Sequence, residues 1–74
     1  MAKITLENIG EVVTYHAPDA EQLEHYAEIR FAASNFIQVI LLNTPECADQ
    51  TAAIRKVREA MMTANASIAL RGLV

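Results

Sequence analysis

The sequence predicts an all-α fold, an antiparallel two-helix hairpin that follows an extended arm and assembles into an oligomer. Three observations support this prediction. Two long segments place apolar residues at helical spacing, and the short breaker Asn43-Thr44-Pro45 separates them. A helix-start signal stands at Asp19. Finally, 53 % of the 74 residues are hydrophobic, more than a two-helix chain can bury by itself.

The arm, residues 1–18, carries both strand and turn signals. Lys3–Leu6 and Glu11–Tyr15 are rich in β-branched residues, whereas Asn8 and Gly10 between them favour a turn. We therefore expect an extended segment, or a small two-stranded hairpin that depends on the helices beneath it.

The first helix is expected over residues 19–43. Pro18 restricts the backbone just before the helix, and Ala17 before it is biased away from helical conformation. Asp19 is a suitable N-cap, and Gln22 three residues later completes a capping-box pattern.

The second helix is expected over residues 45–71. Thr44 can cap it, Pro45 can occupy its first position, and Gly72 is a natural stop. Because the link between the helices is short, the two must run antiparallel, and residues 1–74 form a single domain.

The apolar rows indicate what each helix contacts. The first helix carries two rows, and the second helix carries one main row with several alanines beside it. One row per helix closes the hairpin, so the remaining apolar surface is expected to pack on other copies. The rows are Leu23, Tyr26, Ala27, Ala33, Ile37, Ile40 and Leu41; Ile29, Ala32, Phe36 and Val39; and Ile54, Val57, Met61, Ala64 and Ile68.

Charge and composition exclude several classes of function. A net charge of −3 argues against binding polymeric DNA or RNA, which needs an extended basic surface. The single cysteine, Cys47, allows no disulfide within the chain and indicates a reducing, cytoplasmic setting. The N-terminus is too polar for a signal peptide, and the apolar run Phe36–Leu42 is too short to span a membrane.

Catalytic and metal-binding patterns are missing from the sequence. His16 and His25 are nine residues apart with no HExxH or CxxC motif, so we expect no metal site and no cofactor. The only glycines, Gly10 and Gly72, form no phosphate-binding loop. An enzyme of unknown class is thus the weakest interpretation.

The second helix offers a better case for ligand binding. Arg55, Arg58 and Asn65 share one stripe with Thr51 and Met62, at spacings of three and four. Two guanidinium groups and an amide on one stripe suit recognition of phosphates and bases. The alternative is an ordinary solvated face whose arginines pair with nearby acidic residues. Asn65 lies in a small, apolar run and should bond a neighbour or a ligand.

Further candidates lie at the mouth of the first helix. Tyr15, with His16 beside it, either packs against the helices or presents its ring for stacking. Arg30 interrupts the main apolar row, so it either extends to solvent or meets an anion at an interface.

A longer pattern runs along the chain. It consists of Thr14-Tyr15-His16-Ala17-Pro18, Gln22, Tyr26, Ile29-Arg30, Ala33, the Pro45 turn and the segment 60–69, Ala-Met-Met-Thr-Ala-Asn-Ala-Ser-Ile-Ala. In order and spacing this pattern resembles a family of phage and prophage helical hairpins that includes the anti-CBASS and anti-Thoeris sponge proteins. The resemblance covers about residues 13–70.

The resemblance implies a function. Such proteins assemble into oligomers, often hexamers, and bind cyclic nucleotide second messengers without cleaving them, in the cytoplasm of an infected bacterial host. By resemblance, Tyr15 corresponds to a base-stacking aromatic, Arg30 to a phosphate contact and Asn65 to a polar position of the second helix. Arg55 lies close to an arginine that some members use for cyclic trinucleotides. Thr63 departs from the pattern, because many members have Trp there.

Two function classes therefore compete. In the first, neighbouring copies combine Tyr15 rings and Arg30 side chains around cyclic di- or trinucleotides, or cyclic ADP-ribose-like signals. In the second, the hairpin is a structural or protein-docking module with no nucleotide ligand, and its spare apolar row contacts another protein.

Overall fold

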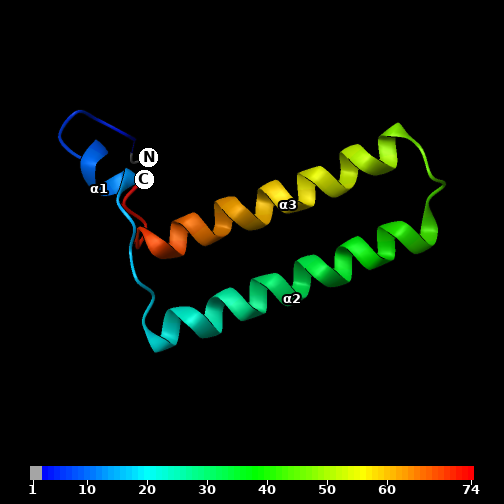
Figure 1. The fold of residues 1–74 in the computed structure, drawn as a ribbon, viewed down its shortest axis with the longest axis horizontal. Helices are drawn as coiled ribbons and strands as arrows, with labels where there is room; N and C mark the ends of the chain where they lie inside the picture. Colours follow the sequence, from blue (N-terminus) through cyan, green and yellow to red (C-terminus); the bar gives the residue numbers. More distant parts are fainter. Residues whose placement is uncertain (1–2) are drawn as a thin grey trace.

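The computed structural model describes residues 3–74, which form three helices (Figure 1). A short helix, α1 (Ile9–Val13), precedes two long ones, α2 (Ala20–Asn43) and α3 (Ala48–Ala69). The long helices lie side by side and antiparallel, and α1 lies beyond the C-terminal end of α3, close to the C-terminus of the chain. The predicted all-α hairpin is therefore confirmed for the described residues, and residues 1 and 2 of the expected arm lie outside them.

The arm differs from the expectation of a strand or small β-hairpin, because residues 9–13 are helical and no strand occurs between residues 3 and 74. Local side-chain hydrogen bonds explain the difference. The Thr5 amide donates to Asn8 Oδ1 at 2.7 Å, and the Asn8 amide donates to Thr5 Oγ1 at 3.2 Å. This reciprocal pair closes a first turn, which outweighs the β propensity of the valines that follow. Residues 14–19, between α1 and α2, form an extended connection.

The start of α2 matches the sequence signal. Asp19 Oδ1 accepts a hydrogen bond from the Gln22 amide at 2.8 Å, and Gln22 Oε1 accepts one from the Asp19 amide at 3.1 Å. This capping box satisfies two amides at the helix end and directs the chain from Pro18 into α2.

The link between the long helices is longer than expected, since α3 begins at Ala48 rather than at residue 45. Thr44 caps the preceding helix instead of the following one. Its amide and its Oγ1 both donate to the Ile40 carbonyl, at 3.1 and 2.6 Å. Pro45 explains this choice, because it holds Thr44 in an extended conformation (φ −127°, ψ 152°) that ends α2.

The end of α3 is also earlier than residue 71. Arg71, with φ 51°, takes the left-handed position that glycine usually fills, and Gly72 follows with φ 76°. The Arg71 amide donates to the Ile68 carbonyl and the Gly72 amide to the Ser67 carbonyl, at 3.1 and 3.0 Å. These two bonds form a Schellman ending one residue before the expected stop.

The chain is elongated and has almost no interior. Its radius of gyration is 15.3 Å, whereas a compact domain of this length has about 11 Å. Among residues 3–74, Ile40 is the one buried hydrophobic residue. The accessible surface of 5915 Å² exceeds by about 1,400 Å² that of a compact monomer of this mass.

The hairpin presents two broad faces of different chemistry. One face, which we call the apolar face, is built by Ile29, Ala32 and Phe36 of α2 with Ala53, Val57 and Ala60 of α3. Helical periodicity places Arg30, Ser34 and Arg58 on the other side. No helix in the described residues is long and apolar enough to cross a membrane.

Candidate functional site

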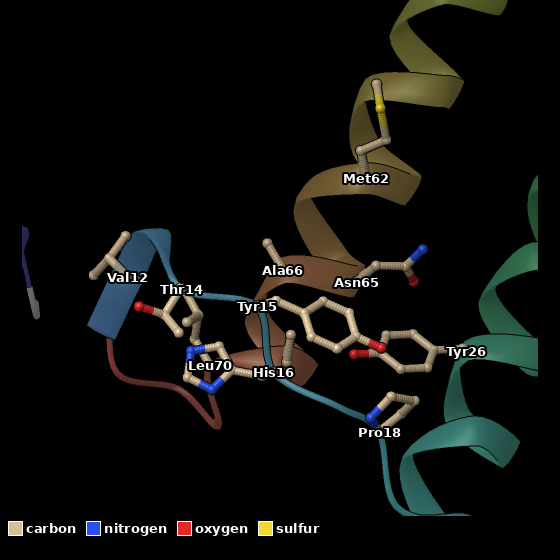
Figure 2. Close-up of a pocket in the computed structure, with 11 residues that line it drawn as sticks. Val12, Thr14, Tyr15, His16, Pro18, Tyr26, Met62, Asn65, Ala66 and Leu70 are labelled. Carbon is tan, nitrogen blue, oxygen red and sulfur yellow. The ribbon is translucent and has the colours of Figure 1, made fainter. Parts of the chain in front are cut away.

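A cleft of about 510 Å³ opens where the arm meets the ends of the two long helices, a size typical of ligand sites (Figure 2). We call it the tyrosine cleft. The arm and both long helices contribute side chains to it. Its lining residues are Val12, Thr14, Tyr15, His16, Pro18, Tyr26, Met62, Asn65, Ala66, Ala69 and Leu70.

The arm positions Tyr15 through the residues on either side of it. Thr14 Oγ1 donates to the Gly10 carbonyl, and His16 Nε2 donates to the Glu11 carbonyl at 2.7 Å. Both bonds tie the extended segment back to α1. Figure 2 shows the Tyr15 ring directed toward Tyr26 of α2, away from the His16 ring. Tyr15 is 83 % exposed, so a broad aromatic surface is available in the cleft.

Asn65 of α3 brings an unused hydrogen-bonding group to the same place. Its amide lies beside the hydroxyl ends of Tyr15 and Tyr26 (Figure 2). Its Oδ1 atom is buried and has no hydrogen-bond partner. Such an acceptor destabilises the ligand-free protein by about 1–3 kcal/mol. The Oδ1 atom is therefore available to a hydrogen-bond donor that enters the cleft.

Among residues 3–74, no Lys, Arg, Asp or Glu lines the tyrosine cleft. It combines apolar surface and two aromatic rings with hydroxyl, imidazole and amide groups. That chemistry suits a flat, uncharged group such as a nucleobase, which stacks on aromatic rings and hydrogen-bonds through its edge.

The cations lie in a neighbouring groove of about 370 Å³, which we call the arginine groove. Arg30 of α2 and Arg58 of α3 line it from opposite sides. It lies on the same side of the hairpin as the tyrosine cleft, because Tyr26 precedes Arg30 by four residues and Met62 follows Arg58 by four. Four residues correspond to about 6 Å along a helix. The tyrosine cleft and the arginine groove are thus neighbours on one face of the hairpin.

The six residues singled out from the sequence are divided between these two sites. Tyr15, His16 and Asn65 line the tyrosine cleft, and Arg30 and Arg58 line the arginine groove. Arg55 is exposed and lines neither.

Tyr26 lines the cleft although the sequence does not single it out as a ligand contact, because its spacing places it in the packing row of the first helix. It is half-buried in that row but also faces Tyr15. Its hydroxyl, four residues before Arg30, was the available signal, because a buried phenol needs a polar partner.

Asp19 follows Pro18 at the edge of the tyrosine cleft, and its surroundings change the pKa of its carboxyl group. The hydrogen bond from the Gln22 amide, followed by the Arg71 guanidinium, lowers the pKa of Asp19 below its ordinary value of 3.8. Arg71 Nη2 lies 3.0 Å from Asp19 Oδ2. Asp19 is therefore ionised at neutral pH and serves the fold as a cap. In residues 3–74 no three His, Cys, Asp or Glu side chains gather as metal ligands would.

The family model described as Acb2/Tad1, hairpin domain, matches residues 6–69 of this chain. The chain belongs to this family. The Acb2/Tad1 hairpin is the known anti-CBASS and anti-Thoeris sponge family, a binding domain rather than an enzyme. A general role in cyclic-nucleotide sequestration agrees with this membership. No significant match was found among curated proteins or solved structures.

Proposed function

We propose that this Acb2/Tad1 hairpin binds cyclic nucleotide second messengers and sequesters them uncleaved, in the cytoplasm of an infected bacterium, so that antiphage immunity is suppressed. The observation that carries the proposal is that the tyrosine cleft and the arginine groove lie next to each other on one face of the hairpin. A base and its phosphate are separated by about the length of a ribose, so neighbouring sites suit both.

Binding follows from the chemistry of the two sites. A base enters the tyrosine cleft and stacks on Tyr15, at about 1–3 kcal/mol for each stack. The phosphate lies over Arg30 or Arg58, each charge-assisted hydrogen bond contributing about 1.5–3 kcal/mol. Two such pairs contribute about 5–12 kcal/mol before ordering costs, a range that includes the roughly 8 kcal/mol of micromolar binding. Sequestration needs no group beyond these.

Self-association is the second part of the proposal. Phe36 is 58 % exposed on the apolar face, and Val39 is 49 % exposed one turn beyond it. The surplus of about 1,400 Å² in accessible surface exceeds the ~800 Å² that each partner buries in a standard interface. Copies packed through this face would bury the surplus apolar surface and leave the tyrosine cleft and the arginine groove, on the other side of the hairpin, open to a ligand. A hexamer is what the family resemblance implies.

A structural or protein-docking hairpin is the competing function, and the same exposed apolar face favours it. Calorimetric titration separates the two. The protein is titrated with cyclic dinucleotides, cyclic trinucleotides and cyclic ADP-ribose, and with AMP as a linear reference. A sponge binds at least one cyclic ligand at micromolar affinity or better and releases it unaltered after heat denaturation. A folded protein that binds none of them overturns the proposal.

Substitution of Arg30 sharpens this test. Arg30→Ala should weaken binding by about ten- to 150-fold, which corresponds to the 1.5–3 kcal/mol of one charge-assisted contact. Lys3→Ala removes the same charge from the arm, outside both sites, and should leave the Kd unchanged. Arg55→Ala should affect cyclic trinucleotides alone, as the resemblance implies. Equal affinities of the Arg30 and Lys3 variants would place the phosphate elsewhere.

A further inference from the structure

Gln22 is the one buried polar side chain in residues 3–74, with 8 % of its surface exposed. All of its hydrogen-bonding groups are engaged. Its backbone amide and Oε1 complete the capping box with Asp19, and its Nε2 donates to the Ile68 carbonyl of α3 at 3.0 Å. The capping role needs only Oε1, so the bond from Nε2 requires another explanation.

The bond from Nε2 joins the two long helices at the cleft end of the hairpin. Ile68 lies in the last turn of α3, and its carbonyl also accepts from the Arg71 amide at 3.1 Å. Gln22 therefore fills the second acceptor position of a carbonyl that the Schellman ending already uses. In the described residues, it is the one side-chain hydrogen bond that passes directly from α2 to α3.

This contact underlies the tyrosine cleft. Gln22 precedes Tyr26 by one helical turn on the same side of α2, and Ile68 is next to Ala69, which lines the cleft from α3. Through Asp19, Gln22 also holds the residue after Pro18, where the arm enters the cleft. One side chain thus connects the three segments whose separation sets the width of the cleft.

We propose that Gln22 is a positioning residue, which fixes the distance between the arm, α2 and α3 so that the tyrosine cleft is already formed before a ligand enters. The inference rests on the proposed function, since it concerns ligand binding at the same site. A preformed cleft binds more tightly because less of the binding free energy is used to order it.

The test compares two Gln→Glu variants. In Gln22→Glu a carboxylate oxygen still accepts from the Asp19 amide, so the capping box remains, but no group donates to Ile68. Gln50→Glu is the matched control, because Gln50 Nε2 donates to Thr44 Oγ1 at 3.1 Å at the opposite end of the hairpin. Gln22→Glu should weaken binding of the best cyclic nucleotide at least about fivefold, and Gln50→Glu should not. Equal Kd values for the two variants overturn the inference.

A second readout is independent of ligand binding and of stability. In protein labelled with 3-fluorotyrosine, Tyr15 and Tyr26 give two fluorine signals. Gln22→Glu should shift the Tyr26 signal in the folded, ligand-free protein, whereas Gln50→Glu should leave both signals in place. If the wild type binds no cyclic nucleotide, the proposed function fails while these signals still decide the positioning role. Unshifted signals in Gln22→Glu reject it.

The wild-type protein provides a readout that needs no substitution, should Gln22→Glu fail to fold. Ligand binding should slow hydrogen exchange of the Gln22 side-chain amide and leave that of Gln50 unchanged. Unaltered exchange at Gln22 in the ligand complex shows that the cleft and this contact are independent, and the inference is then wrong.

Discussion

Replacing Asn65 by leucine separates the stability of this protein from its binding. Asn65 Oδ1 is buried without a hydrogen-bond partner, so the ligand-free fold carries an unfavourable desolvation free energy at that atom. Leucine has a similar size and no polar atoms, and nearby Met62, Ala66 and Ala69 give it apolar contacts. We therefore expect Asn65→Leu to stabilise the protein while it removes a ligand contact.

The expected gain in folding stability equals the desolvation cost of one unsatisfied acceptor, about 1–3 kcal/mol. Taking the lower end, Tm should rise by about 4–8 °C for a domain of this size. Affinity for the cyclic nucleotide should fall at least about fivefold, by loss of a hydrogen bond worth about 1 kcal/mol.

The assays are thermal denaturation by circular dichroism and calorimetric titration, both at one fixed protein concentration because self-association affects Tm. Asn65→Asp is the control. It keeps the size but places a charge beside the two tyrosines, so it should lower Tm. A lower Tm in Asn65→Leu would show that the amide has a structural partner, and it would refute the reasoning.

Three further predictions concern stacking, assembly and pH. Tyr15→Ala should weaken ligand binding about five- to 150-fold, and it should change Tm little because the ring is 83 % exposed. Tyr15→Phe keeps the ring and should bind the ligand normally. A normal Kd for Tyr15→Ala would contradict the stacking role. Phe36→Glu should lower the mass of the assembly measured by light scattering. Phe31 is 73 % exposed and lies outside the apolar face, so Phe31→Glu should leave that mass unchanged. Equal masses for the two variants would place the interface elsewhere. Since the folded state lowers the pKa of Asp19, its stabilising effect is complete above about pH 4 and is lost as the pH falls through the lowered value. The Tm difference between the wild type and Asp19→Asn, which retains the cap, should therefore narrow in thermal scans as the pH falls below about 4. A constant difference would show that the ion pair with Arg71 does not stabilise the fold.

The long helices were predictable because several local signals agree. The capping box at Asp19 and Gln22 and the apolar periodicity both predict the first long helix, and the structure confirms it as α2. The α3 start was less predictable, since Thr44 can cap either helix and only its extended conformation before Pro45 decides. At the arm, β-branched residues suggest a strand, but the reciprocal Thr5–Asn8 hydrogen bonds, which depend on geometry, produce a helix.

The candidate site could be predicted only in part for a related reason. Periodicity places Arg58 and Asn65 on one stripe, but it does not indicate that the arm folds back to bring Tyr15 opposite Tyr26. That arrangement depends on contacts between segments distant in sequence. The division of the candidates between a base cleft and an arginine groove likewise emerges only in three dimensions.

The nearly coreless hairpin has a consequence for the lifetime of the protein in a cell. With Ile40 as the one buried hydrophobic residue among those described, a solitary subunit has little to resist unfolding and is readily open to proteases. The proposed self-association and ligand binding would each stabilise the folded state by mass action. We therefore expect newly made subunits to be degraded quickly when dilute and to persist once they have accumulated, so that turnover itself depends on abundance.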